Sequence, residues 1–136
     1  MKTLIYNLPV ILDFLNERIP GGSFEKGLPC VGMLEDGKLV GAVAYNHYTG
    51  NAILMHVAGA KRGWVTRKFL RAAFNYPFHQ LGCTRVTGLV RTDNPVAQDF
   101  DERIGFKREG LIREGDDDGC DLILYGMLKR ECRWID

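Results

Sequence analysis

Residues 93–110 constrain the fold more than any other part of the chain, because they combine the start and stop signals of a helix with the opening of a strand. Asn94 is a favourable N-cap residue, and Pro95 suits the first helical position, where its missing N–H would have no partner anyway. Gly105 is a typical residue just after a helix end. The apolar positions between them recur at helical spacing: Ala97, Phe100 and Ile104. The stretch predicts a strand end, a capped helix and a new strand from about residue 106.

The chain has 136 residues, which suits a single domain over 1–136 and is too short for two. The balance of 46% hydrophobic and 26% charged residues is that of a soluble globular protein. The net charge of +1 gives no general attraction to nucleic acid. No apolar run is long enough to span a membrane, and residues 1–10 lack the features of a signal peptide. We therefore expect a cytoplasmic protein that binds neither nucleic acid nor membrane.

Metal-binding and disulfide patterns are both missing from the sequence. None of the cysteines belongs to a C-x-x-C pair, and no histidine lies near them at ligand spacing. In a reducing compartment they are expected to be free thiols, and we expect no metal. They are Cys30, Cys83, Cys120 and Cys132.

The N-terminal part predicts one helix and one hairpin. The helix covers 9–19, with Asn7 as its cap and Val10, Phe14 and Leu15 on its apolar face, and residues 20–22 stop it. Strands over 31–35 and 38–45 follow, joined by Asp36-Gly37, a strong signal for a two-residue hairpin turn.

The remaining chain predicts further strands and helices in alternation. Strands are expected over 52–58, 83–91, 106–113 and 122–128, and helices over 64–76, where Pro77 ends the helix, and 95–104. A helix joins strand 52–58 to strand 83–91, so these two should be parallel neighbours with a right-handed crossover. The fold class is therefore α/β (α+β): a mixed, mostly antiparallel central sheet with helices on both faces.

The loop 59–63 leaves a strand and enters a helix. Free N–H groups at a helix start, together with the helix dipole, suit a phosphate. Basic side chains add positive charge in and after this loop: Lys61, Arg62, Arg67, Lys68 and Arg71. Two alternatives stay open, an ordinary solvated basic helix and a small nucleic-acid-binding surface, although the net charge disfavours the second.

These motifs together resemble the GNAT family of acyl-CoA-dependent N-acyltransferases. The stretch 93–110 is similar to the family pattern of Asn, two residues, Ala, about seven residues and Gly-Phe. Arg62-Gly63 resembles the start of the family's pyrophosphate loop. Residues 105–114 and 121–128 look like the corresponding segments of the ribosomal-protein N-terminal acetyltransferase subgroup. Short members with a Trp in the loop occur among phage proteins, which suggests a phage or prophage origin.

The resemblance implies acetyl-CoA (coenzyme A) as co-substrate. It implies that the backbone of Val57 and Ala58 bonds the pantetheine arm like an added strand and that the Asn94 side chain contacts the same arm, although Asn94 could serve as a helix cap alone. The pyrophosphate would lie on the loop residues Arg62, Gly63, Trp64, Val65 and Thr66. Two positions that are glycine in the family hold Val65 and Arg67 here, and their side chains restrict the approach of phosphate to the backbone.

Two residues are candidates for catalysis. The family pattern places Tyr seven residues after the Asn, where it protonates the departing thiolate, and Asp101 stands there in this chain. A solvated Asp, with a pKa of about 3.9, is ionised at neutral pH, so Asp101 can be an acid only if it is buried. His56 is the only titratable group on strand 52–58 and the candidate base. Strand alternation places it opposite Val57, so a hydrogen-bonded core histidine is the alternative.

The expected function is N-acetyltransfer from acetyl-CoA to a primary amine by direct attack. A site without an obvious base suits a peptide α-amine, whose pKa is lower than that of lysine. The acidic turn 114–121 borders the acceptor cleft in the family and would attract a small cationic amine, although Asp and Gly are also ordinary turn residues. The alternative is a non-catalytic GNAT-like module that binds CoA or a partner protein. The sequence leaves room for a homodimer.

Overall fold

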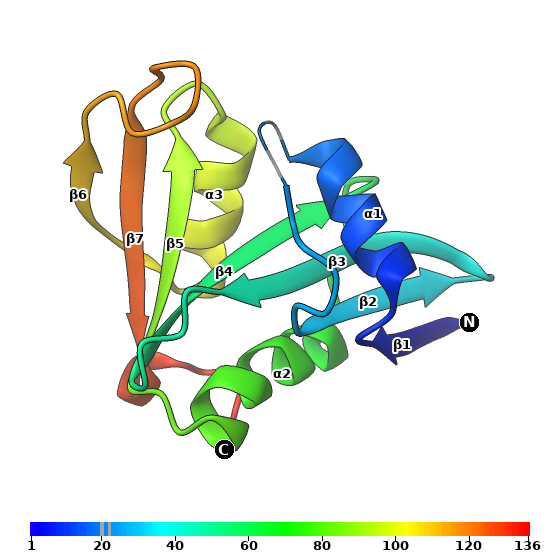
Figure 1. Cartoon of the computed structure of the whole chain (residues 1–136). Helices are drawn as coiled ribbons and strands as arrows, with labels where there is room; N and C mark the ends of the chain where they lie inside the picture. The colour runs from blue at the N-terminus through cyan, green and yellow to red at the C-terminus, as the bar shows by residue number, and fades with distance from the viewer. Residues whose placement is uncertain (20, 22) are drawn as a thin grey trace.

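The computed structural model describes residues 1–19, 21 and 23–136, and these form a seven-stranded sheet with three α-helices (Figure 1). The strand order is β1-β2-β3-β4-β5-β7-β6, and the only parallel neighbours among these strands are β4 and β5. The fold class is as predicted, a mixed and mostly antiparallel sheet with helices on both faces.

The N-terminal half contains β1 (Lys2–Tyr6), α1 (Pro9–Arg18), β2 (Cys30–Glu35), β3 (Lys38–Asn46) and β4 (Ala52–Gly59). Asp36 and Gly37 both have positive φ, 52° and 84°, as the predicted two-residue hairpin turn requires. The sequence predicted no strand before residue 30, and this was wrong. β1 pairs with β2 along its whole length, but it is a short edge strand with no turn signal in front of it.

The C-terminal half contains α2 (Arg67–Asn75), β5 (Arg85–Arg91), α3 (Pro95–Ile104), β6 (Lys107–Ile112) and β7 (Leu122–Leu128). A π-helical turn, Tyr76–Gln80, follows α2, and a 3-10 turn, Lys129–Glu131, follows β7. All four cysteines are free, as expected. No helix among the described residues is long and apolar enough to cross a membrane.

The sheet splays apart between β4 and β5. These strands pair over three residues only, Ala52–Leu54 of β4 against Arg85–Thr87 of β5. Beyond Leu54 they diverge, and among the residues that the structure describes the rest of β4 pairs only with β3 (Figure 1). The divergence, which we call the split, leaves an open strand edge inside the molecule.

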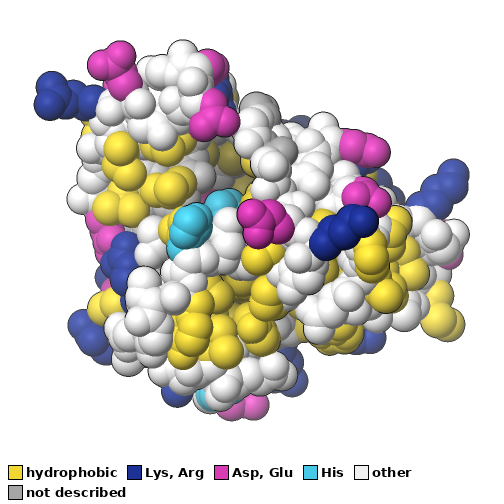
Figure 2. All heavy atoms as spheres, in the orientation of Figure 1, with side chains coloured by type: hydrophobic (Ala, Val, Ile, Leu, Met, Phe, Trp, Pro, Cys, Tyr) yellow, Lys and Arg dark blue, Asp and Glu magenta, His cyan; other side chains and the backbone are white. Residues whose placement is uncertain are grey.

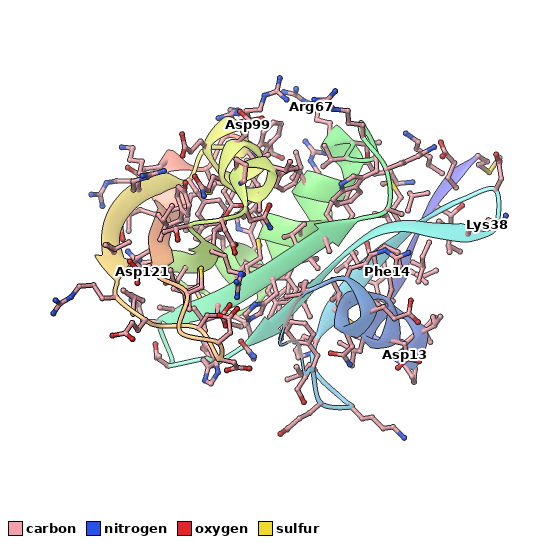
Figure 3. The ribbon with its side chains drawn as sticks, turned by 90° about the horizontal axis from the view of Figure 1, so that it is seen from above. Asp13, Phe14, Lys38, Arg67, Asp99 and Asp121 are labelled. Atoms are coloured by element: carbon pink, nitrogen blue, oxygen red, sulfur yellow. The ribbon has the colours of Figure 1, made fainter. Side chains whose placement is uncertain are left out.

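Two cores cover the two faces of the sheet. α1 lies on one face and buries Ile11, Phe14 and Leu15 against Ala42 and Ala44 of β3. α2 and α3 lie on the other face over the larger core. Figure 3 shows the same division: Asp13 and Phe14 of α1 lie below the sheet, and Arg67 of α2 and Asp99 of α3 lie above it.

The start of α1 differs from the prediction. Leu8 is the cap residue, and Asn7 instead turns the chain at φ 56° and accepts a hydrogen bond from the Cys30 N–H at 3.0 Å. Val10 is exposed, and the buried residues are Ile11, Leu12, Phe14 and Leu15. The predicted stop signal includes Pro20 and Gly22, which lie outside the described residues.

The bounds of α2 also differ from the prediction. The helix begins at Arg67, three residues later than expected, because the Thr66 hydroxyl caps it by accepting from the Phe69 N–H at 3.1 Å. Pro77 does not end the helical structure, although α2 itself ends at Asn75. It lies in the π-helical turn, where the Leu81 N–H donates to the Tyr76 carbonyl at 3.0 Å, five residues back.

Candidate functional site

The open edge of β4 offers backbone groups to a ligand. The Ala60 N–H donates to the Val40 carbonyl of β3 at 2.9 Å. This bond shows which peptide groups of β4 point toward β3. Along an antiparallel pair the peptide groups point alternately toward and away from the partner. Those of Ala58 therefore face β3, and those of Val57 and Gly59 face the split. An extended arm could pair with this edge as an added strand, and Val57 suits that role better than Ala58.

The basic loop follows this edge directly. Within the part of the chain that the structure describes, the N–H groups of Val65, Thr66, Arg67 and Lys68 donate to no protein acceptor. They lie at the start of α2, at the positive end of its dipole, where a phosphate binds well. Because α2 starts later than predicted, the free amides lie at 65–68. The sequence placed Lys68 in the basic stretch after the loop but did not place its backbone amide among the phosphate-binding groups, although Thr66 is a recognisable cap.

Not all of the predicted positive charge is free. Lys61 pairs with Glu35, and Arg71 lies 3.8 Å from Asp136. Arg62, just before the free amides, and Lys68, the last residue of the set, are both exposed. The loop therefore keeps cationic side chains near its unbonded N–H groups.

Asn94 caps α3, as predicted. Its side-chain oxygen accepts from the Ala97 N–H at 3.1 Å. This bond uses the oxygen for the cap, so a contact with the pantetheine arm would involve the side-chain nitrogen, and that contact stays a prediction.

Asp101 lies on the inner side of α3, against β5. Its Oδ2 is 3.2 Å from the place where a Cβ on Gly88 would stand, so Gly88 leaves room for it. Gly88 directly follows Thr87, the last residue of β5 that pairs with β4, so the carboxyl group lies beside the start of the split. Burial raises the pKa of Asp101 to about 7, and the nearby charge of Glu102 adds to the effect. Asp101 is partly buried, and its raised pKa keeps the role of acid open as a prediction.

His56 lies on the opposite face of the sheet, on the α1 side. Its Nε2 is 2.8 Å from Oδ1 of Asn46, and its ring is 5.0 Å from that of Phe24. Burial lowers the pKa of His56 to about 4, with a smaller contribution from His47. The ring is therefore neutral at pH 7. It can accept a proton, but it is a weak base.

The acidic turn is held by one arginine. Arg91, at the end of β5, pairs with Asp93, Asp116 and Asp118 at 2.7–2.9 Å, and its hydrogen bonds to Asp118 lower the pKa of that carboxyl to about 2. Figure 2 shows the molecule hollowed between the β5–β7 half and the α1 half, with histidine side chains near the bottom of the hollow and acidic side chains beside it. Arg91 therefore neutralises part of this charge, and the sequence carries no signal for that pairing.

Comparison with known proteins gives matches at the level of structure. No protein-family model and no curated protein sequence matches the chain. A probable acetyltransferase of known structure is 28% identical with a TM-score of 0.65; the match covers 75% of this chain and 61% of that protein, so the chain spans less than two thirds of its length. A variant of the spermidine N-acetyltransferase SpeG from Vibrio cholerae is 17% identical, with a TM-score of 0.74 over 94% of each chain. A GNAT-family acetyltransferase from Bacillus anthracis is 15% identical, with a TM-score of 0.71 over 96% of each chain.

These likenesses show that the chain has the fold of the GNAT acetyltransferases. They confirm the fold that residues 93–110 suggested. The resemblance to the ribosomal-protein subgroup, the phage origin and the roles of individual residues stay predictions.

Proposed function

We propose that this chain is an N-acetyltransferase that moves an acetyl group from acetyl-CoA to a primary amine by direct attack. One observation carries the proposal: the unpaired edge of β4 is followed, across the loop 60–64, by the unbonded amides at the start of α2. An extended amide-bearing arm that ends in phosphates has the chemistry to fill both parts at once. The residues present therefore fit coenzyme A.

Each part of the site has a separate task in binding. The backbone of Val57 holds the pantetheine arm, and the amides of residues 65–68 hold the pyrophosphate. Arg62 and Lys68 add charge attraction to the phosphates. Acetyl-CoA, when bound, supplies an activated acyl group and a thiolate leaving group.

The protein contributes two proton transfers, one from each face of the sheet. The neutral amine forms a C–N bond to the thioester carbon, and the C–S bond then breaks. Asp101, about half protonated at neutral pH, gives its proton to the departing sulfur directly or through a water. His56, on the α1 side, is the candidate acceptor of the proton that the amine loses. Its low pKa makes it a weak proton acceptor, so the reaction depends on the fraction of the amine that is neutral before attack.

The acceptor follows from the same reasoning. A peptide α-amine, with a pKa of about 7.8, is partly neutral at cytoplasmic pH, whereas a lysine amine is not. Similarity of residues 105–114 to the ribosomal-protein subgroup favours an α-amine, and a small cationic amine is the second candidate, favoured by the likeness to SpeG and by the acidic turn. A cytoplasmic location and a phage or prophage origin belong to this proposal.

Calorimetric titration with CoA, paired with thermal unfolding, tests the proposed site. At a ligand concentration one hundred times the dissociation constant, we expect stabilisation of about 2.7 kcal/mol. No heat of binding and no shift with millimolar CoA would contradict the proposal. Binding without turnover of acetyl-CoA on any amine would favour the alternative, a non-catalytic CoA-binding module.

A further inference from the structure

The loop that follows β4 carries a large aromatic side chain, Trp64, directly before the free amides of residues 65–68. Trp64 is the one buried residue between Ala60 and Thr66, with 6% of its side chain exposed. A Cβ on Gly41 or on Gly59 would stand 2.0 Å from its indole ring. These two glycines face each other across β3 and β4. The indole therefore lies flat on a patch of bare backbone at the end of the strand pair that leads into the loop.

The other contacts of Trp64 join the elements around the split. Its ring meets that of Phe69 of α2 edge-on, at a centroid distance of 4.8 Å. It stacks on Phe100 of α3, at 6.0 Å and an interplanar angle of 13°. Phe100 precedes Asp101 in α3, so one side chain ties the loop to the strand pair, to the helix that offers the amides, and to the helix with the candidate acid.

We propose that Trp64 is a positioning residue that sets the free amides of residues 65–68 for the pyrophosphate of CoA. The inference rests on the proposed function. The loop carries Val65 and Arg67 at positions where glycine would let a phosphate come closest to the backbone. The shape of the loop must therefore be fixed in another way. Gly41 and Gly59 supply the missing space beneath the loop and seat the indole. The rigid indole ring of Trp64, packed against β3 and β4, holds the loop in place where the family has flexible glycines.

The test compares two ligands that share the arm and differ in the phosphates. Dissociation constants for CoA and for pantetheine are measured by ligand-detected NMR on the wild-type chain and on Trp64→Leu. We expect Trp64→Leu to weaken CoA at least tenfold and to change pantetheine less than twofold. Gly59→Ala, which displaces the indole without altering it, should give the same selective loss. It replaces Trp64→Leu in the test if Trp64→Leu does not fold. Phe74→Leu, a core change elsewhere under α2, is the control and should change neither affinity.

A second readout needs no ligand. Exposed Lys61 and Arg62 are trypsin sites within the loop, and cleavage there requires the loop to open. We expect faster cleavage at these residues in Trp64→Leu and Gly59→Ala than in Phe74→Leu.

The outcomes separate the two claims. Equal losses for CoA and pantetheine, or unchanged affinity for both in a folded Trp64→Leu protein, would overturn the role of Trp64 and leave the proposed function standing. Failure of the wild-type chain to bind CoA would contradict the proposed function itself, and this inference with it.

Discussion

At the scale of single residues, the surroundings of a side chain decide what it can do, and sequence shows those surroundings only in part. Asp101 was correctly placed on α3 from the helix spacing, but its burial depends on Gly88, thirteen positions away on β5. His56 was correctly assigned to the face opposite Val57 by strand alternation. Its partner Asn46 lies on β3 and carries no signal in the sequence. The positions could therefore be predicted, whereas the proton affinities could not.

Asp101 should give the reaction an alkaline limit. The acid must be protonated to donate, so kcat should fall as pH rises through about 7. Asp101→Asn should lower kcat by about a hundredfold at pH 6.5 and remove that limit, because a thiolate leaves fairly well without an acid. Asp101→Tyr should restore activity and move the limit to about pH 10. A pH–kcat profile of Asp101→Asn that matches the wild type would show that another group donates the proton.

The same carboxyl group should weaken the unliganded fold at high pH. Its pKa is about 7 in the folded chain and about 3.9 when unfolded, so stability is complete below the unfolded value and is lost as pH rises through 7. Asp101→Asn should be more stable than the wild type by up to about 4 kcal/mol at pH 8 and equally stable at pH 3.5. Urea unfolding at the two pH values measures this difference. An unchanged free energy of unfolding at pH 8 would mean that Asp101 is solvated.

His56 should act in the opposite direction. Its pKa is lower in the folded chain, so stability is complete above about 6.5 and falls as pH drops toward 4, by about 3 kcal/mol. His56→Gln should remove this acid sensitivity.

If His56 also accepts the amine's proton, the variant should lose about a hundredfold in kcat with little change in CoA affinity. His47→Gln is the matched control, because it removes an exposed histidine nearby. Full activity in a folded His56→Gln protein would leave His56 a purely structural role.

At the scale of elements, the sequence predicted most strands and the C-terminal helix because their signals are local. The Asp36-Gly37 turn and the Asn94 cap with its glycine stop are examples. The start of α2 was placed too early because Trp64 and Val65 continue an apolar pattern. Burial of the indole against β3 and β4 holds Trp64 outside the helix, and Thr66, whose backbone is extended, then caps the helix. The split has no local signal in the sequence, since its position depends on where two distant strands stop pairing.

The loop gives a prediction at this scale. Gly63 has φ 69°, and a Cβ there meets nothing within 4 Å, so any side chain adds mainly backbone strain, about 1 kcal/mol. Gly63→Glu should also place a carboxylate beside the phosphates and weaken CoA at least a hundredfold. Gly63→Ala carries the same strain without the charge and should weaken CoA by less than tenfold. Equal affinities in the two variants, measured by calorimetry, would place the phosphates elsewhere.

At the scale of the whole molecule, the split can be reached from both faces of the sheet. The amides of α2 and the carboxyl group of Asp101 lie on the face covered by α2 and α3, whereas His56 and the hollow of Figure 2 lie on the α1 face. A donor from one face and an acceptor from the other would meet in the split.

Turnover tests this account most directly. The chain is incubated with acetyl-CoA and a panel of peptides with free N-termini, polyamines and Nα-blocked lysine peptides, and the products are identified by mass spectrometry. We expect an N-acetylated primary amine formed in equal amount with free CoA, fastest for α-amines and formed about a hundredfold more slowly by Asp101→Asn near neutral pH. A chain that binds CoA tightly but acetylates no amine in the panel would contradict it.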